Sequence, residues 1–332
     1  MNYVGMDVHK LFCQTCVLDE QKEEIANDKV RTDRDSIERY VKNFDDDTKF
    51  AIEATIRSRF VYRILTAKGF EVKVADPKAL AAITRSKKKT DLNDARILAK
   101  MLYLDEIPET YVPDERIMKI RDLTRNRKQL VERSTAIKNQ IHATITEEGV
   151  WIPPKTDIFT NERKGWLRSL GMLSVDINLN CLDVTGENIK HYDKLIDEVF
   201  NETPEAQLLE TIPGVGVLSA VSIIAEIGDA SRFSSPDQLC AYSGLVPSVR
   251  QSGSSAHYGR ITKQGPPQLR ALMIECMHMH AQHDPDSRLS GFFQRKTNER
   301  GRKKAVVAGG RKMLRIIYYM LRDTERYHSQ GS

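Results

Sequence analysis

The sequence predicts a chain of mixed class, in which an α/β domain is followed by an α-helical segment with coiled-coil character and a mainly α-helical domain. Strand and helix signals alternate up to about residue 111, and apolar residues then recur at intervals of seven. Beyond about residue 205 the apolar segments have the length and period of helices. A chain of 332 residues is long enough for two or three domains, and we expect them at residues 1–112, 113–204 and 205–332.

The N-terminal part should form a mixed sheet of the ribonuclease-H-like type. Expected strands lie near residues 3–8, 11–18, 24–31, 49–53 and 71–75, and expected helices near 35–44 and 57–68. Three leading strands joined by short turns, followed by alternating helices and strands, fit such a sheet better than a doubly wound one. Proteins of this fold class often carry out metal-dependent phosphoryl chemistry. Because fold alone does not determine function, this chemistry has to be argued from candidate site residues.

Four acidic residues of this part are candidate ligands of a divalent metal ion: Asp7, Glu53, Asp91 and Asp94. Asp7 lies inside a β-prone apolar run and Glu53 ends another, at positions where acids of an open α/β sheet usually face the ligand crevice. Asp91 and Asp94 stand three residues apart at the start of a helical segment, so they share one face. Because clustered acids repel one another unless a cation neutralises them, the set predicts a metal site.

For Asp91 and Asp94 taken alone, a second interpretation is at least as good. Asp91 would cap the helix, and Asp94 would interact favourably with the helix dipole. The two strand acids favour the metal site over this interpretation.

Composition restricts the class of protein. Hydrophobic residues make up 40% and charged residues 29%, as in a soluble globular chain. No apolar run approaches the roughly 18 residues of a membrane span, and the N-terminus lacks a signal-peptide core. We therefore expect a cytoplasmic protein without a membrane partner. The five cysteines are odd in number and scattered, so they do not predict a disulfide framework.

Basic residues are concentrated in three runs although the net charge is only +5. Candidate nucleic-acid contacts in the first two runs are Lys87, Lys88, Lys89, Arg125, Arg127 and Lys128. The third run covers residues 288–326. Any single run could be a solvated helix face. Three basic runs in a chain that also has candidate metal-binding acids indicate a polyanionic substrate, since phosphate groups would neutralise the positive charge of the runs.

The middle segment should contain one long helix over residues 114–147. Leu123, Leu130 and Ile137 recur at sevens, and a returning helix is expected at residues 190–200. The apolar pattern of residues 157–186 does not specify their secondary structure clearly. Leu123, Leu130 and Ile137 would form an apolar stripe along one side of the long helix. Packing of the stripe against the returning helix and dimerisation through it explain the pattern equally well.

Two segments of the C-terminal part suggest contact with phosphates. Gly214 and Gly216 lie between two helical segments, as in a helix-hairpin-helix, where backbone amides can hold a DNA phosphate. A plain helix turn explains them equally well. The Ser/Gly-rich segment 250–265 resembles a flexible loop by composition. It also carries serines among Arg250, Arg260, Lys263 and Arg270, and cations around a serine help it to attack a phosphodiester.

Six segments, taken in order, resemble the DEDD transposases of the insertion-sequence family numbered one hundred and ten. They are residues 5–10, 52–55, 89–96, 212–216, 244–247 and 252–255. They cover both ends of the chain, with a less specific helical middle. Ile56 departs from the family, which commonly has glycine at that position.

The resemblance implies a RuvC-like N-terminal domain, a coiled-coil insert and a C-terminal transposase domain. It implies a site-specific DNA recombinase that acts in the nucleoid and uses an element-encoded non-coding bridge RNA to join donor and target DNA. It also implies a homodimer that assembles into a tetramer, and leaves open which of the two is the active form.

The resemblance also assigns roles to residues. The four carboxylates named above would bind Mg²⁺, with Mn²⁺ as the alternative. Ser252 would be the nucleophile that forms a transient phosphoserine link to DNA, with Ser254 and Ser255 as second choices.

Other functions remain open on the residues alone. A RuvC-like, metal-dependent junction-resolving nuclease would use the acids to activate water and would form no covalent intermediate. A non-catalytic nucleic-acid-binding protein would use the acids as helix caps. A metal site formed by Cys276, His278, His280 and His283 is a weaker alternative, because their spacing scatters them around a helix.

Overall fold

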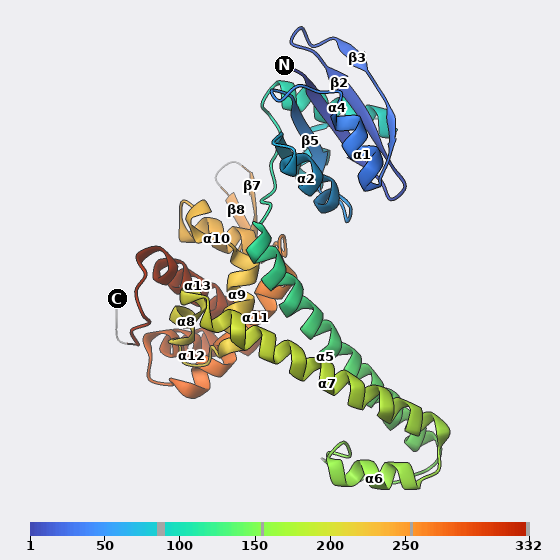
Figure 1. The fold of residues 1–332 in the computed structure, drawn as a ribbon. Coiled ribbons are helices and arrows are strands. Elements are labelled where there is room, and N and C mark those ends of the chain that lie inside the picture. The colour runs from blue at the N-terminus through green and yellow to red at the C-terminus, as the bar shows by residue number, and fades with distance from the viewer. Residues whose placement is uncertain (85–89, 154–155, 253–254, 330–332) are drawn as a thin grey trace. The chain divides into compact units, whose positions relative to one another are not determined.

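The computed structural model describes residues 1–332 except 85–89, 154–155, 253–254 and 330–332, and for residues 84, 250–252 and 255–258 it describes the backbone alone. The chain divides into two compact units, Met1–Val112 and Pro113–Ser332 (Figure 1). Within the described ranges, no helix combines the length and the apolar character needed to cross a membrane. The division of the second unit into two domains stays a prediction.

The first unit is built on a mixed sheet, which confirms the predicted α/β class. Its strands are β1 (Tyr3–Val8), β2 (Phe12–Leu18), β3 (Glu24–Ala26), β4 (Lys29–Arg31), β5 (Lys49–Glu53) and β6 (Glu71–Ala75). The sheet order is β3-β2-β1-β5-β6, and β4 also pairs with β2. β1 is antiparallel to β2 and parallel to β5. The strand expected at 24–31 is two short strands, and each pairs separately with β2.

Helices cover both faces of this sheet. They are α1 (Arg34–Val41), α2 (Ser58–Ala67), α3 (Pro77–Thr84) and α4 (Asp91–Tyr103). Ile37 of α1 and Leu65 of α2 pack in one cluster with Phe50 of β5. Leu98 of α4 packs in another with Ala51, the next residue of β5. Because side chains alternate along a strand, α4 covers the opposite face from α1 and α2.

Gly5 allows α4 to lie directly against β1. A Cβ atom at Gly5 would stand 2.1 Å from the Ala95 carbonyl oxygen and 2.4 Å from the Ala99 nitrogen, both of which are helix backbone. Backbone cannot move aside as a flexible side chain can. The absence of a side chain at Gly5 therefore sets the distance between α4 and the strand.

We expect Gly5→Val to destabilise the first unit by about 1–3 kcal/mol, because it forces α4 away from the sheet. Chemical denaturation should show a lower midpoint. Gly186→Ala is the matched control, since Gly186 lies in a helix where a Cβ atom would have no other atom within 4 Å, and alanine there should gain up to about 1 kcal/mol. An unchanged midpoint for Gly5→Val would contradict this helix position.

The second unit is mainly helical, as predicted. Its helices are α5 (Glu115–Glu147), α6 (Asn161–Ser169), α7 (Leu173–Asn201), α8 (Pro204–Glu210), α9 (Val217–Ile227), the short 3₁₀ helix η1 (Ala230–Arg232), α10 (Pro236–Ser243), α11 (Pro267–His283), α12 (Arg288–Arg300) and α13 (Arg302–Asp323). A hairpin of β7 (Pro247–Ser252) and β8 (Ser255–Ile261) lies between α10 and α11 along the chain. α9 is buried from Ala220 to Ile227 and forms the centre of the unit's main core.

The two long helices run antiparallel beside each other (Figure 1). At their far end Ile141 and Ile145 of α5 pack with Val175 and Leu179 of α7. Of the predicted stripe, Ile137 packs against this cluster and Leu123 packs against the main core of the unit, so both contacts lie within one chain. Dimerisation through the stripe stays a prediction. α7 begins 17 residues before the start of the expected helix at 190, because packing against α5 outweighs the interrupted apolar pattern of its first half.

Candidate metal centre and serine hairpin

Asp7 lies near the carboxyl end of β1 and faces α4. It shares a strand face with Gly5, against which α4 packs. Its side chain is 8% exposed. Burial raises the pKa of Asp7, the charge of His9 opposes this shift, and the negative charges of Asp94 and Asp91 add to it. Ionised Asp7 is therefore costly in this position unless a cation is near.

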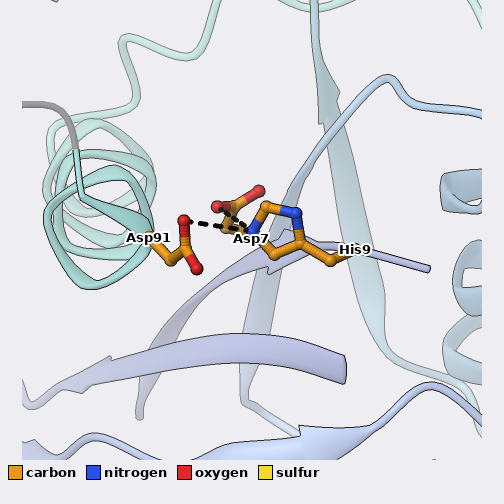
Figure 2. A group of neighbouring side chains, drawn as sticks. All are labelled: Asp7, His9 and Asp91. Carbon is orange, nitrogen blue, oxygen red and sulfur yellow. Dashed lines mark ion pairs between the residues drawn. The ribbon is translucent and has the colours of Figure 1, made fainter. Parts of the chain in front are cut away.

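His9 and Asp91 bring ligand atoms to Asp7 (Figure 2). His9 Nε2 lies 2.9 Å from Asp7 Oδ2 and 3.4 Å from Asp91 Oδ1. In the described part of the chain, these three residues form the group whose ligand atoms all lie within 4.8 Å of one another, a spacing that could hold a metal ion. Asp91 does not cap α4, because Thr90 is the N-cap and accepts a hydrogen bond from the Asn93 amide. The capping interpretation of Asp91 is wrong.

The other two predicted acids lie at the same end of the sheet. Met6 and Ile52 are partners in the parallel β1–β5 ladder, so the next residues, Asp7 and Glu53, continue this register on the same face. Asp94 follows Asp91 by one helical turn and acts on the pKa of Asp7. Neither Glu53 nor Asp94 belongs to the group of ligand atoms within 4.8 Å among the described residues. Ile56, three residues after Glu53, is fully exposed and so takes no part in the core.

The residues present fit a divalent metal ion. His9 Nε2 is buried and makes no hydrogen bond of good geometry, although two carboxylate oxygens lie close to it. A protonated Nε2 pairs with these carboxylates, and a neutral Nε2 offers its lone pair to a cation that the same carboxylates hold. His9 is not among the metal ligands predicted from the sequence. The available signal was its spacing of two residues from Asp7 at a strand end, which places both side chains on one face.

The predicted nucleophile lies in the β7–β8 hairpin of the second unit. Ser252 is the last residue of β7 and pairs with Ser255, the first residue of β8, through the backbone register. The side chains of Ser252, Ser255 and Arg250 are outside the description, and Ser254 lies in one of the gaps. The expectation of a flexible loop is wrong for the strand residues, since segments 247–252 and 255–261 pair as a ladder.

Comparison with known proteins identifies the family. An IS110-type DEDD family model described as "Transposase" matches residues 4–148, and the model described as "Transposase IS116/IS110/IS902 family" matches residues 206–291. The chain belongs to the IS110 family of transposases. The first match contains the four carboxylates and His9, and the second contains Ser252. The predicted resemblance is thus confirmed, and with it membership in a family of enzymes that act on DNA.

Individual relatives agree with this IS110-family assignment. The chain is 29% identical over 243 residues to the putative transposase y4qE of Sinorhizobium fredii, covering 68% of this chain and 57% of the relative. It is 28% identical over 282 residues to the transposase for insertion sequence element IS1111A of Coxiella burnetii, covering 80% of this chain and 75% of the relative. A pilin gene-inverting protein of Moraxella bovis is 33% identical over 159 residues, which are 43% of this chain and 48% of that protein.

Several cations predicted to contact nucleic acid have protein partners in this IS110-family chain. The Arg125 guanidinium donates to both carboxylate oxygens of Glu226, at 2.9 and 3.0 Å, and the Glu226 side chain is only 3% exposed. Arg127 pairs with Asp193 across the α5–α7 helix pair. Arg270 Nη1 donates to three carbonyl oxygens, those of Ser243, Gln264 and Gly265, each at 3.0 Å. These arginines hold the second unit together.

The remaining predicted cations of the transposase differ in their surroundings. Lys128 Nζ lies 3.8 Å from Oε1 of Glu132, which is one helical turn further along α5. Arg260 and Lys263 are exposed near the end of the hairpin. Lys87, Lys88 and Lys89 lie outside the described residues. Arg260 and Lys263 are therefore the predicted cations that the described structure leaves available to a phosphate.

The segment predicted as a helix-hairpin-helix consists of α8, a turn and α9, and its contact with a phosphate stays a prediction. Gly214 has a φ of +89°, and a Cβ atom there would stand 2.4 Å from the His280 nitrogen, so packing against α11 explains this glycine. Gly216 is the N-cap of α9, where nothing lies within 4 Å of a Cβ atom. His280 is buried between the Pro213 carbonyl oxygen and Ser287 Oγ, at 2.8 and 2.9 Å. Burial lowers its pKa, and its two ring nitrogens are used structurally, which removes the basis for the Cys/His metal site.

Proposed function

We propose that the chain cleaves and rejoins DNA through a serine–phosphodiester intermediate, with Mg²⁺ held by Asp7, Glu53, Asp91 and Asp94. The observation that carries the proposal is the approach of Asp91, at the start of α4, to buried Asp7 within the residues that match the DEDD family model. The sheet order supports a ribonuclease-H-like, RuvC-like first domain, in which this end of the sheet carries the metal-binding acids.

The residues of the chain have distinct tasks in this proposal. Burial of Asp7 and close packing of α4 at Gly5 hold the acids in place before DNA arrives. A bound divalent cation would polarise the scissile phosphate and stabilise the charge of the departing oxygen. Ser252 Oγ would form a bond to phosphorus as the bond to a deoxyribose oxygen breaks, and the serine proton would pass to that oxygen directly or through water. The new phosphodiester conserves the bond energy, so rejoining needs no ATP.

Exposed cations beside the hairpin would support this chemistry. Arg260 and Lys263 lie on the same segment as Ser252 and would stabilise the charge that builds on the phosphate oxygens. The proposed partners are donor and target DNA and an element-encoded bridge RNA. The proposed oligomer is a homodimer that assembles into a tetramer.

A cleavage assay with end-labelled donor and target DNA, bridge RNA and the purified full chain tests this function. With Mg²⁺ we expect a protein–DNA adduct that survives denaturing detergent, followed by recombined DNA. EDTA should reduce both products by at least about 10³-fold, because the charge on the phosphate is then uncompensated. Free 5′-phosphate ends without an adduct would instead indicate the junction-resolving nuclease, and binding without cleavage would indicate a non-catalytic protein.

A further inference from the structure

We propose that His9 is itself a ligand of this metal centre, and that its ring nitrogen makes the site prefer Mn²⁺ to Mg²⁺. The inference rests on the proposed metal site and concerns a residue outside the four carboxylates. It names both a ligand and a metal preference that the carboxylates alone do not imply.

The backbone on both sides of His9 fixes where its side chain lies. His9 follows the last residue of β1, and its amide donates to the Phe12 carbonyl oxygen at 2.9 Å. Its own carbonyl oxygen accepts a hydrogen bond from Thr32 Oγ1 at 3.0 Å. The imidazole also packs against the Phe12 ring, with centroids 5.0 Å apart. A side chain held in this way is oriented before a metal ion binds, which is what a precise ligand requires.

The position of Nε2 matches a ligand better than a hydrogen-bond donor. Nε2 is buried and lies 2.9 Å from Asp7 Oδ2 and 3.4 Å from Asp91 Oδ1, yet it makes no hydrogen bond of acceptable geometry to any described atom. A hydrogen bond needs the N–H to point at one oxygen. Here one nitrogen and two oxygens, from three different residues, all lie within 4.8 Å of one another. That arrangement offers a cation three ligand atoms.

A nitrogen among the ligands changes which ion the site favours. Mg²⁺ prefers oxygen ligands in a near-ideal octahedron and keeps several water molecules. Imidazole is a good ligand for divalent first-row transition metals. The affinity of these ions for mixed nitrogen and oxygen sites increases from Mn²⁺ to Cu²⁺. Of these ions, Mn²⁺ is the probe of choice because carboxylate-rich sites also accept it. Adding one imidazole to the carboxylates therefore favours Mn²⁺ over Mg²⁺ more than the carboxylates alone would.

Metal binding by the full chain tests the role of His9 without using catalytic activity. We expect His9→Ala to weaken Mn²⁺ binding by about 10–100-fold in calorimetry while changing Mg²⁺ binding by less than about 3-fold. Electron spin-echo spectra of the Mn²⁺-bound native chain should show modulation from a directly bound nitrogen, and this should vanish in His9→Ala. His191→Ala, at an exposed position of α7, is the matched control and should change neither result.

A second variant separates ligand loss from misfolding. His9→Phe keeps a ring against Phe12 but has no nitrogen, so it should fold like the native chain and bind Mn²⁺ as weakly as His9→Ala. If Asp7→Asn abolishes Mn²⁺ binding while both His9 variants keep native affinity and the nitrogen signal, the inference about His9 is overturned and the carboxylate site stands. If the native chain binds neither Mn²⁺ nor Mg²⁺, the proposed metal-dependent function fails together with it.

Discussion

Asp7→Asn is expected to reduce strand cleavage by at least about 10³-fold while DNA binding changes by less than about 2-fold. Asp7 is the buried member of the proposed metal centre, and Asp91 and His9 both approach its carboxylate. An amide has nearly the same shape but carries no charge and offers one oxygen instead of two. Binding should persist because the exposed cations Arg260 and Lys263 belong to the other compact unit.

The same substitution should make the first unit more stable at neutral pH. Burial raises the pKa of Asp7 above its ordinary 3.8, so the folded state holds this proton more tightly than the unfolded state. The resulting stabilisation is present below about pH 3.8 and is lost as the pH rises through the folded-state pKa. At pH 7 native Asp7 is therefore a cost, and Asn should raise the free energy of unfolding by about 0.5–2 kcal/mol.

Denaturation at pH 7 and at pH 4 measures this gain, which should shrink at the lower pH. Asp46→Asn is the matched control, because Asp46 is an exposed acid of the same unit. It should alter neither cleavage nor stability. Native cleavage by Asp7→Asn would remove Asp7 from the catalytic machinery, whatever its effect on stability.

Patterns local to one strand or one helix were sufficient to predict the framework of the site. An apolar strand that ends in an acid occurs twice, at Asp7 and Glu53, and parallel pairing of β1 with β5 places these residues side by side in register. The helical spacing of Asp91 and Asp94 needed only the period of a helix. The close approach of α4 was not predicted, because a glycine in a strand has several meanings until its neighbour is known.

These local patterns could not predict contacts between residues that are far apart in the sequence. Arg125 resembles any other cation of a basic run, and only the fold shows that buried Glu226, about 100 residues later, binds it. Arg270 likewise binds carbonyl oxygens that no pattern in the chain specifies. The hairpin was missed for another reason. Its polar composition favours a loop, although Gly253 and Ser254 between two extended runs are a signal for a hairpin.

Ser252→Ala should abolish the covalent protein–DNA adduct, with a loss of at least about 10³-fold, because it removes the oxygen atom that would bond to phosphorus. Alanine is compatible with the last residue of β7, so the backbone pairing with Ser255 and the affinity for DNA should be retained. The measurement is the amount of labelled DNA that stays attached to the chain under denaturing conditions, with DNA binding followed separately by a mobility shift.

Ser255→Ala provides the matched control on the paired strand of the same hairpin. It removes an identical hydroxyl group at the position opposite Ser252, and should leave the adduct within about 3-fold of the native amount if only Ser252 attacks. Loss of the adduct in Ser255→Ala alone would mean that Ser255, and not Ser252, is the nucleophile. Continued cleavage without any adduct in the native chain and in both variants would mean that water attacks the phosphate. The acids would then serve a hydrolytic nuclease, because without a serine link the energy of the broken bond is not kept for rejoining.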